Sequence, residues 1–380
     1  MANETKNTAS AGSSVSKRTA GNGNGADLGV AGAAPGGRKP FLPGLNLQLP
    51  HWAARFLRPR LPGLAVIFQK DALVLVHMHR GARGAAPSLA HISHHQLPEG
   101  TLTPGLSEPN FSAPAEASAR LGRALDALPN RRKLNRISIV LPDACARVIL
   151  LDLQAAPQSR RQVEQMIRWQ VRKRVPFKLD DARMSIQRFP LPAGGERVAV
   201  VLGLERILAQ YEQVVSALGL KPGLLDLATL NMANLCAQVR ENQGAADAGD
   251  VALLNVADEE FSIFILRRGV PLFYRSRPLL HDPVRQPREC LGDVRRELIT
   301  SSAYYRDRLG GAEERIRHVW LRVAGQSSFP MEEAVKSTLG TVAQRIQPQH
   351  LLPLEGMSAV DGGLLELAAP ALGITAGRWS

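Results

Sequence analysis

One stretch in the middle of the chain, Ile137 to Leu227, constrains the fold most, because runs typical of strands, helices and turns alternate along it. Two runs rich in Val, Ile and Leu flank Pro142-Asp143, a pattern that predicts two strands joined by a turn. Residues 159–174 predict an amphipathic helix, because apolar side chains recur at spacings of three and four. This helix ends before Pro176, since the residue that precedes a proline is pushed out of the helical region.

The predicted helix has one apolar stripe and one basic face. The apolar positions are Val163, Met166, Ile167 and Val171. The basic positions are Arg160, Arg161, Arg168, Arg172, Lys173 and Arg174. Because the apolar stripe must pack against a core, we expect the basic face to meet solvent or a partner. Further apolar runs predict strands at 184–189 and 197–204, then a helix at 207–218 that leads into a turn at Gly219.

Apolar periodicity in the rest of the chain predicts a second set of elements. They are a hairpin at 62–78, a helix at 115–128, three strands between 251 and 280, a helix at 290–309, a strand at 316–323, and helices at 331–339 and 360–372. The hairpin and the later group of strands begin in a similar way. Such an internal repeat of the pattern is what two duplicated lobes would give.

The order of these elements resembles the PilM family of type IV pilus assembly proteins, which is actin-like and related to FtsA. The matching residues are Leu151, Leu153, Trp169, Val175-Pro176-Phe177, Gly219-Leu220, Pro222 and Asp226. The resemblance extends over roughly residues 62 to 378. It implies an α/β, actin-like fold of two lobes, with a small inserted α+β subdomain. An ordinary α/β domain, in which strands and helices merely alternate, remains the alternative.

The resemblance and the composition together predict six segments. They are a disordered tail at 1–45, a basic and aromatic linker at 46–61, the first part of lobe 1 at 62–135, the inserted subdomain at 136–210, the second part of lobe 1 at 211–245, and lobe 2 at 250–380. The tail is rich in Gly, Ala, Asn and Ser and has almost no aliphatic cluster. It therefore cannot bury enough apolar surface to offset the entropy of ordering.

Charge and cysteine content bear on location. The chain has 47 basic and 34 acidic residues, a formal net charge of +13. In the linker, Trp52 and Phe56 lie beside Arg55, a pattern that fits weak contact with an anionic leaflet, a solvated linker, or packing onto the next domain. No nucleic-acid-binding motif accompanies the charge. No apolar run is long enough to span a bilayer, and the first residues do not have the pattern of a secretory signal. The cysteines are odd in number, three, and lie far apart in the sequence. We therefore expect a cytoplasmic protein with free, buried thiols.

The nucleotide motifs depart from the family pattern. Actin-like ATPases hold phosphates with two Asp-x-Gly hairpins, but the corresponding positions here read Ala65-Val66-Ile67 and Asn255-Val256-Ala257. The adenosine motif survives as Ala324-Gly325-Gln326-Ser327. We expect no carboxylate at either hairpin to organise Mg²⁺ and hence no hydrolysis. Any ATP would bind weakly, through Asn255 and Gly325. The histidines of residues 91–95 read as a solvated polar loop rather than a metal site.

The resemblance implies a scaffold function. It predicts that the chain binds the short cytoplasmic N-terminus of a single-span inner-membrane protein of the PilN type, in a groove between the inserted subdomain and lobe 1. The candidate contact residues lie near Trp169, Val175 and Phe177. Other pilus machine components, peripheral membrane contact and homo-oligomers are further expected partners. Two alternatives stay open: an ATP-binding conformational switch of the pilus motor, and an actin-like component of a type II secretion system.

Overall fold

The computed structural model describes residues 62–79, 88–154, 159–242, 249–311, 314–325, 330–351 and 360–376. The predicted disordered tail at 1–45 and the linker at 46–61 lie outside the described residues. In the part that is described, no helix combines the length and the apolar character needed to cross a bilayer.

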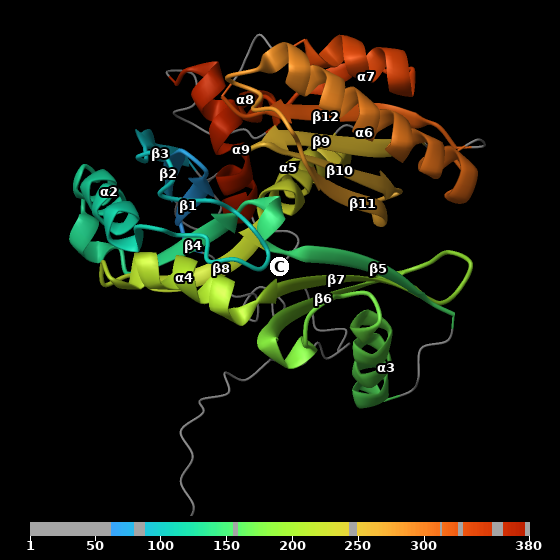
Figure 1. The fold of residues 1–380 in the computed structure, drawn as a ribbon, viewed down its shortest axis with the longest axis horizontal. Coiled ribbons are helices and arrows are strands. Elements are labelled where there is room, and N and C mark those ends of the chain that lie inside the picture. The colour runs from blue at the N-terminus through green and yellow to red at the C-terminus, as the bar shows by residue number, and fades with distance from the viewer. Residues whose placement is uncertain are drawn as a thin grey trace, which may run out of the picture. The chain divides into compact units, whose positions relative to one another are not determined.

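The first lobe is built on a mixed five-stranded sheet in the order β3-β2-β1-β4-β8 (Figure 1). Its strands are β1 (Leu64–Gln69), β2 (Ala72–His79), β3 (Ser88–Gln96), β4 (Arg136–Leu141) and β8 (Lys221–Leu227). Its helices are α2 (Pro114–Asp126) and α4 (Glu205–Ser216), which pack their apolar faces on one side of the sheet. Phe68, Phe111 and Tyr211 meet edge to face within that core, at ring-centre distances of 4.9 to 5.7 Å.

The second lobe repeats this plan with the strand order β11-β10-β9-β12-β13. Its strands are β9 (Asp250–Ala257), β10 (Glu260–Arg267), β11 (Val270–Pro278), β12 (Ile316–Val323) and β13 (Ala343–Arg345). Its helices are α6 (Pro287–Arg308), α7 (Met331–Leu339), α8 (Pro348–Leu351) and α9 (Gly362–Ala376). Both sheets therefore begin with an antiparallel hairpin and continue with a parallel strand, β4 in the first and β12 in the second. The two lobes thus share one strand topology, as the repeated sequence pattern predicted.

A shared core lies between the two sheets. It is formed by α9 and by α5 (Ala228–Asn242), together with apolar residues from β1, β2, β9 and β10. The two helices approach closely at Gly373, where an added Cβ would lie 1.9 Å from the carbonyl oxygen of Asn231. Glycine is therefore required at this crossing. Because α9 also contacts β1 and β2, this helix packs on both lobes.

A third sheet forms the inserted subdomain, with the strand order β5-β7-β6. Its strands are β5 (Arg147–Leu153), β6 (Ala182–Pro190) and β7 (Glu196–Leu204), and α3 (Arg160–Arg172) covers one face. The side chain of Ser159 caps α3 by accepting a hydrogen bond from the backbone N–H of Gln162. Val163, Ile167 and Val171 are buried against the sheet, as the predicted apolar stripe requires.

Three predictions need correction. The strand β4 pairs with β1 and β8, and Ile207 of α4 lies in the lobe 1 core, so the inserted subdomain is narrower than the predicted 136–210 at both ends. The helix α9, which was assigned to lobe 2 (250–380), also packs on lobe 1. The histidines His91, His94 and His95 lie in the edge strand β3 rather than in a loop, because their backbone pairs with β2.

Candidate functional site

One face of the inserted sheet lines an apolar groove. Side chains alternate along a strand, so β7 directs Val198, Val200 and Leu202 toward α3 and the residues between them toward the opposite face. That opposite face borders a cavity of about 180 Å³. The cavity residues of the inserted sheet are Val148, Leu150, Arg183, Ser185, Gln187, Ala199, Val201 and Gly203. Ala199 contributes only a methyl group to this wall, and Leu208 of α4 occupies the place beside Gly203, where an added Cβ would lie 3.0 Å from its methyl carbons.

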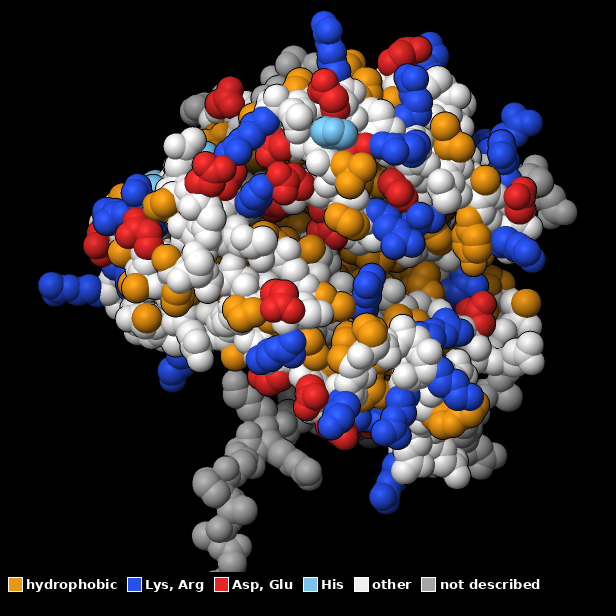
Figure 2. Space-filling model, in the orientation of Figure 1, with side chains coloured by type: hydrophobic (Ala, Val, Ile, Leu, Met, Phe, Trp, Pro, Cys, Tyr) orange, Lys and Arg blue, Asp and Glu red, His pale blue; other side chains and the backbone are white. Residues whose placement is uncertain are grey.

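The opposite walls come from both lobes. Lobe 1 contributes part of β8 and nearby helices, and lobe 2 contributes Phe264 and Pro271. The lobe 1 residues are Leu141, Ala146, Leu208, Leu224, Leu225, Asp226, Leu227 and Leu230. In Figure 2, hydrophobic side chains line a hollow at the level where Figure 1 places β11 beside β5. The groove therefore lies between the inserted subdomain and lobe 1, and lobe 2 closes one side.

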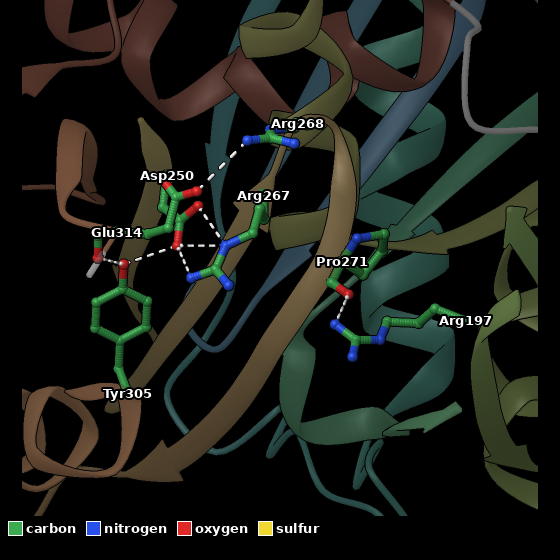
Figure 3. A network of polar contacts seen from close by, with 7 residues as sticks. All are labelled: Arg197, Asp250, Arg267, Arg268, Pro271, Tyr305 and Glu314. Carbon is green, nitrogen blue, oxygen red and sulfur yellow. Dashed lines mark hydrogen bonds and ion pairs between the residues drawn. The ribbon is translucent and has the colours of Figure 1, made fainter. Parts of the chain in front are cut away.

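An arginine fixes the subdomain beside lobe 2. Arg197 of β7 forms an ion pair with Asp152 of β5, with Nε 2.6 Å from Oδ1. Its Nη1 also donates to the carbonyl oxygen of Pro271 on β11, at 3.1 Å (Figure 3). At the same turn end of this hairpin, Arg267 and Tyr305 donate hydrogen bonds to Asp250, which is buried at the start of β9 (Figure 3). The turn end of the β10–β11 hairpin is therefore held from two sides, by Arg197 at Pro271 and by Asp250 at Arg267, beside the groove wall that Pro271 provides.

A single carboxyl group faces this otherwise apolar groove floor. The backbone N–H of Leu227 donates to Oδ1 of Asp226 at 2.8 Å, and among the described residues no other hydrogen bond to this carboxyl is found. Burial raises the pKa of Asp226 to about 7, and the nearby Asp143 carboxyl adds to the rise. An ionised carboxylate in such surroundings is stabilised by a donor or a cation. The groove thus has mainly apolar walls, with Arg183, Ser185 and Gln187 on the inserted sheet and the Asp226 carboxyl on the floor.

The three candidate partner residues, Trp169, Val175 and Phe177, do not line this groove. Trp169 is 61% exposed on the outer face of α3, away from the groove lining. Val175 and Phe177 are partly buried after α3, and Phe177 packs against both the subdomain core and the lobe 1 core. Phe177 therefore holds the subdomain on lobe 1. The sequence missed the groove residues because they come from strands far apart in the chain, although Asp226 was among the matched motif residues.

The two hairpins that resemble phosphate-binding hairpins are tied to each other. The backbone N–H of Lys70, at the β1–β2 tip, donates to Oδ1 of Asp258 at 3.0 Å. Its Nζ lies 2.7 Å from Oε1 of Glu259. Asp258 and Glu259 form the β9–β10 tip with φ of 54° and 59°, a left-handed conformation that costs energy in residues other than glycine. The contacts with Lys70 offset part of that cost, and they join the two lobes.

Behind these tips, side chains fill the space between the lobes. Arg322 of β12 is 1% exposed and donates to Oδ1 of Asn255 at 2.9 Å. The amide nitrogen of Asn255 donates to Asp143 and to Thr229, each at 3.2 Å. Asp143 also accepts from the backbone N–H of Thr229 at 3.1 Å. Asn255, a predicted nucleotide contact, is thus occupied by internal hydrogen bonds from both lobes.

Three carboxyl groups border this filled space, which corrects the expectation that none remains. Asp143, Asp258 and Glu260 line a cavity of about 10 Å³, at the lower limit for one water molecule. Burial raises the pKa of Asp258 to about 6 and that of Glu260 to about 8. The sequence comparison missed them because it considered the Asp-x-Gly positions, whereas these side chains come from the turn after β4, the hairpin tip and the start of β10.

Gly325, the other predicted nucleotide contact, lies apart from Asn255. It follows β12 with φ of 81° and borders an outer cavity of about 270 Å³, together with Lys70, Asp258 and Glu259. Asn255 lines the small inner cavity instead. Besides His94, four acidic and two basic side chains line the outer cavity. This excess of negative charge repels a triphosphate that is not bound to a metal ion.

Comparisons with known proteins bear on the fold. No protein-family model matches the sequence, and no curated protein matches it. A chain of the PilM-PilN type IV pilus biogenesis complex aligns with a TM-score of 0.68 and 19% identity, over 83% of this chain and 98% of that one. A Bacteroides thetaiotaomicron protein with an actin-like ATPase fold and unknown function aligns with a TM-score of 0.44 and 10% identity, over 76% of this chain and 92% of that one. The cytoplasmic domain of EpsL, an inner membrane component of the Vibrio cholerae type II secretion system, aligns with a TM-score of 0.40 and 10% identity, over 79% of this chain and 97% of that one.

The first of these alignments extends over nearly the whole of the matched chain, and it shows a shared fold. The actin-like, two-lobe α/β fold with an inserted subdomain, predicted from the sequence, is confirmed. The predicted resemblance to PilM is confirmed at the level of the fold.

Proposed function

We propose that this chain is an actin-like scaffold of a type IV pilus assembly machine that does not hydrolyse ATP. It acts in the cytoplasm, peripheral to the inner membrane, and binds the short cytoplasmic N-terminus of a single-span membrane protein of the PilN type. The observation that carries the proposal is the apolar groove between the inserted sheet and lobe 1. The complex whose chain shares this fold is a PilM-PilN complex, which supports the same partner class.

The groove suits an extended peptide. Its floor includes Leu224 to Leu227 of β8, the last strand of the first sheet, and its wall includes Val148 and Leu150 of the edge strand β5. An extended segment binds such a place through main-chain hydrogen bonds, and its alternate side chains enter the apolar space. A membrane protein with a short cytoplasmic tail supplies a segment of this kind.

Asp226 gives the groove a means of selecting its peptide. Its carboxyl is surrounded by leucines and accepts one hydrogen bond from the backbone, as described above. A peptide that places an ammonium, guanidinium or amide group there gains a charge-assisted hydrogen bond, worth about 1.5 to 3 kcal/mol. A wholly apolar peptide would leave the carboxyl buried and without that donor.

The test uses a fluorescent peptide with the sequence of the N-terminal tail of a single-span membrane protein of the PilN type, taken from the same genome. Ala199→Trp, which fills the hollow of the groove, should weaken binding by at least about tenfold, since it removes the space for a side chain. Ala193→Trp, the same substitution in the exposed β6–β7 turn, should bind as the natural chain does.

Substitution of the groove carboxyl gives a second measurement with the same peptide. Asp226→Leu should weaken binding by about 10- to 100-fold, the equivalent of one charge-assisted hydrogen bond. Equal affinities for the natural chain, Ala199→Trp and Asp226→Leu would place the peptide elsewhere. No binding by the intact chain would overturn the scaffold proposal itself.

The tied hairpins favour a scaffold over an ATP-driven switch. An actin-like switch binds phosphates between the two hairpin tips, where Lys70 here joins Asp258 and Glu259, and Arg322 fills the space behind them. A nucleotide would have to break these contacts before it could bind. A component of a type II secretion system would use the same groove, and the identity of the neighbouring membrane protein distinguishes the two machines.

A further inference from the structure

The outer face of α3 combines positive charge with an exposed aromatic side chain. From Ser159 to Asp181 the chain has seven basic and three acidic residues. On α3 itself, Arg161, Arg168, Arg172 and Trp169 are exposed and lie on the side away from the subdomain core. Figure 2 shows Lys and Arg side chains gathered over the part of the molecule where Figure 1 places α3.

Most of this charge has no acidic partner among the residues that the structure describes. Glu164 lies 3.5 Å from Nε of Arg168, an exposed ion pair of the weakest kind. Among the described residues, no ion pair is found for Arg161 or Arg172. Asp180 and Asp181 follow in the short helix after α3 and reduce the net charge without removing it. The face therefore favours an anionic partner.

Trp169 decides between kinds of anionic partner. It is 61% exposed, and Nζ of Lys173 lies 3.5 Å from its ring centre. A nucleic acid would stack a base on such a ring, but Lys173 covers one face of it. At a membrane surface, Trp lies at the level of the headgroups and basic side chains contact lipid phosphates, which matches this pairing.

We propose that the outer face of α3, formed by Arg161, Arg168, Trp169, Arg172 and Lys173, rests on the anionic headgroups of a membrane surface. The apolar stripe of α3 is already used, because Val163, Ile167 and Val171 pack against the inserted sheet. The helix therefore contacts lipid through its polar face and does not insert its apolar one. This inference deepens the proposed peripheral location, but it does not depend on the peptide groove.

The test measures binding of the full chain to vesicles of phosphatidylglycerol and phosphatidylcholine in equal parts, and to phosphatidylcholine alone. The chain should bind the anionic vesicles, less tightly as salt rises, and not the neutral ones. Each basic residue at an anionic surface strengthens binding about fivefold, so Arg168→Glu with Arg172→Glu should weaken it by at least about 25-fold. The matched control, Arg132→Glu with Lys133→Glu, reverses two exposed charges on lobe 1 and should bind as the natural chain does.

Fluorescence separates α3 from the basic residues near the N-terminus. The difference in tryptophan fluorescence between the natural chain and Trp169→Phe is the emission of Trp169. Vesicles with brominated lipid chains should quench this emission. Equal vesicle binding by the two double variants, or no quenching of the Trp169 signal, would overturn the proposal. Loss of single-stranded DNA binding by Arg168→Glu with Arg172→Glu, while vesicle binding persists, would also overturn it. Peptide affinity should be unchanged in these variants, so failure here is distinguishable from failure of the groove.

Discussion

Replacement of Arg322 by Met tests whether an internal cation holds the space between the lobes. The guanidinium donates to Oδ1 of Asn255 at 2.9 Å and to the carbonyl oxygens of Glu366 and Leu367, each at 3.1 Å. Methionine retains an unbranched, flexible stem. The substitution therefore removes mainly the charge and the donors, with a small change in packing.

The expected loss follows from what remains buried. Three acceptors lose their donors, at about 1 to 3 kcal/mol each if none is rehydrated. The carboxyls of Asp258 and Asp143 also lose a nearby positive charge. Because water entry and relaxation recover part of this, we expect the free energy of unfolding to fall by about 3 to 5 kcal/mol at pH 7, the range for breaking a buried ion pair.

The loss should depend on pH. Burial raises the pKa of Asp258 to about 6, and Arg322 acts against that rise. Without Arg322, the Asp258 pKa rises further, so the folded variant binds this proton more strongly than the natural protein does. A group that binds a proton more tightly in the folded state adds stability as the pH falls. The difference between the two proteins should therefore be smaller at pH 5 than at pH 7.

The assay is urea unfolding at both pH values, followed by circular dichroism. The control is Arg188→Met, which breaks the exposed ion pair with Glu196, 2.5 Å between Nη2 and Oε2. It should cost about 0.2 to 1 kcal/mol. If Arg322→Met cost no more than this control, or cost more at pH 5 than at pH 7, the buried network would not hold the lobes as argued.

Two further predictions follow from the same contacts. Phe177→Ala should lower the free energy of unfolding by as much as about 3 to 5 kcal/mol, the usual cost of truncating a buried aromatic side chain. Trp169→Ala should change it by less than about 0.5 kcal/mol, because the Trp169 ring is exposed, and equal effects of the two substitutions in thermal unfolding would contradict the packing of Phe177. Calorimetric titration with Mg-ATP should give no heat of binding, and an assay of phosphate release should show no hydrolysis, because Lys70 joins the hairpin tips and Arg322 fills the space behind them. A micromolar dissociation constant would show that these side chains do not block the nucleotide.

Local patterns fixed many element boundaries. The strand at 316–323 and the helix at 331–339 were predicted with the bounds they have. Pro330 precedes that helix and Gly340, with φ of 71°, ends it, so both signals are local. Sheet membership is not local. The run that forms β4 looks like half of a hairpin with β5, and its pairing with β1 and β8 depends on residues more than 60 positions away.

The site was less predictable for the same reason. Alternation on β7 shows that two faces exist, but not that the face with Ala199 borders β8. Lys70 and Glu259 are ordinary turn residues in sequence, and their ion pair appears when the two lobes are in place. Polar residues of β3 looked like a loop, because an edge strand carries side chains that a buried strand would not.

Side chains join the two lobes where the hairpin tips meet. Lys70 joins the two hairpin tips, and Arg322 supplies a positive charge beside buried carboxyls. Phe264 and Pro271 of lobe 2 border the groove, so its width depends on the angle between the lobes. The contacts that join the lobes therefore also set the width of the groove in this structure.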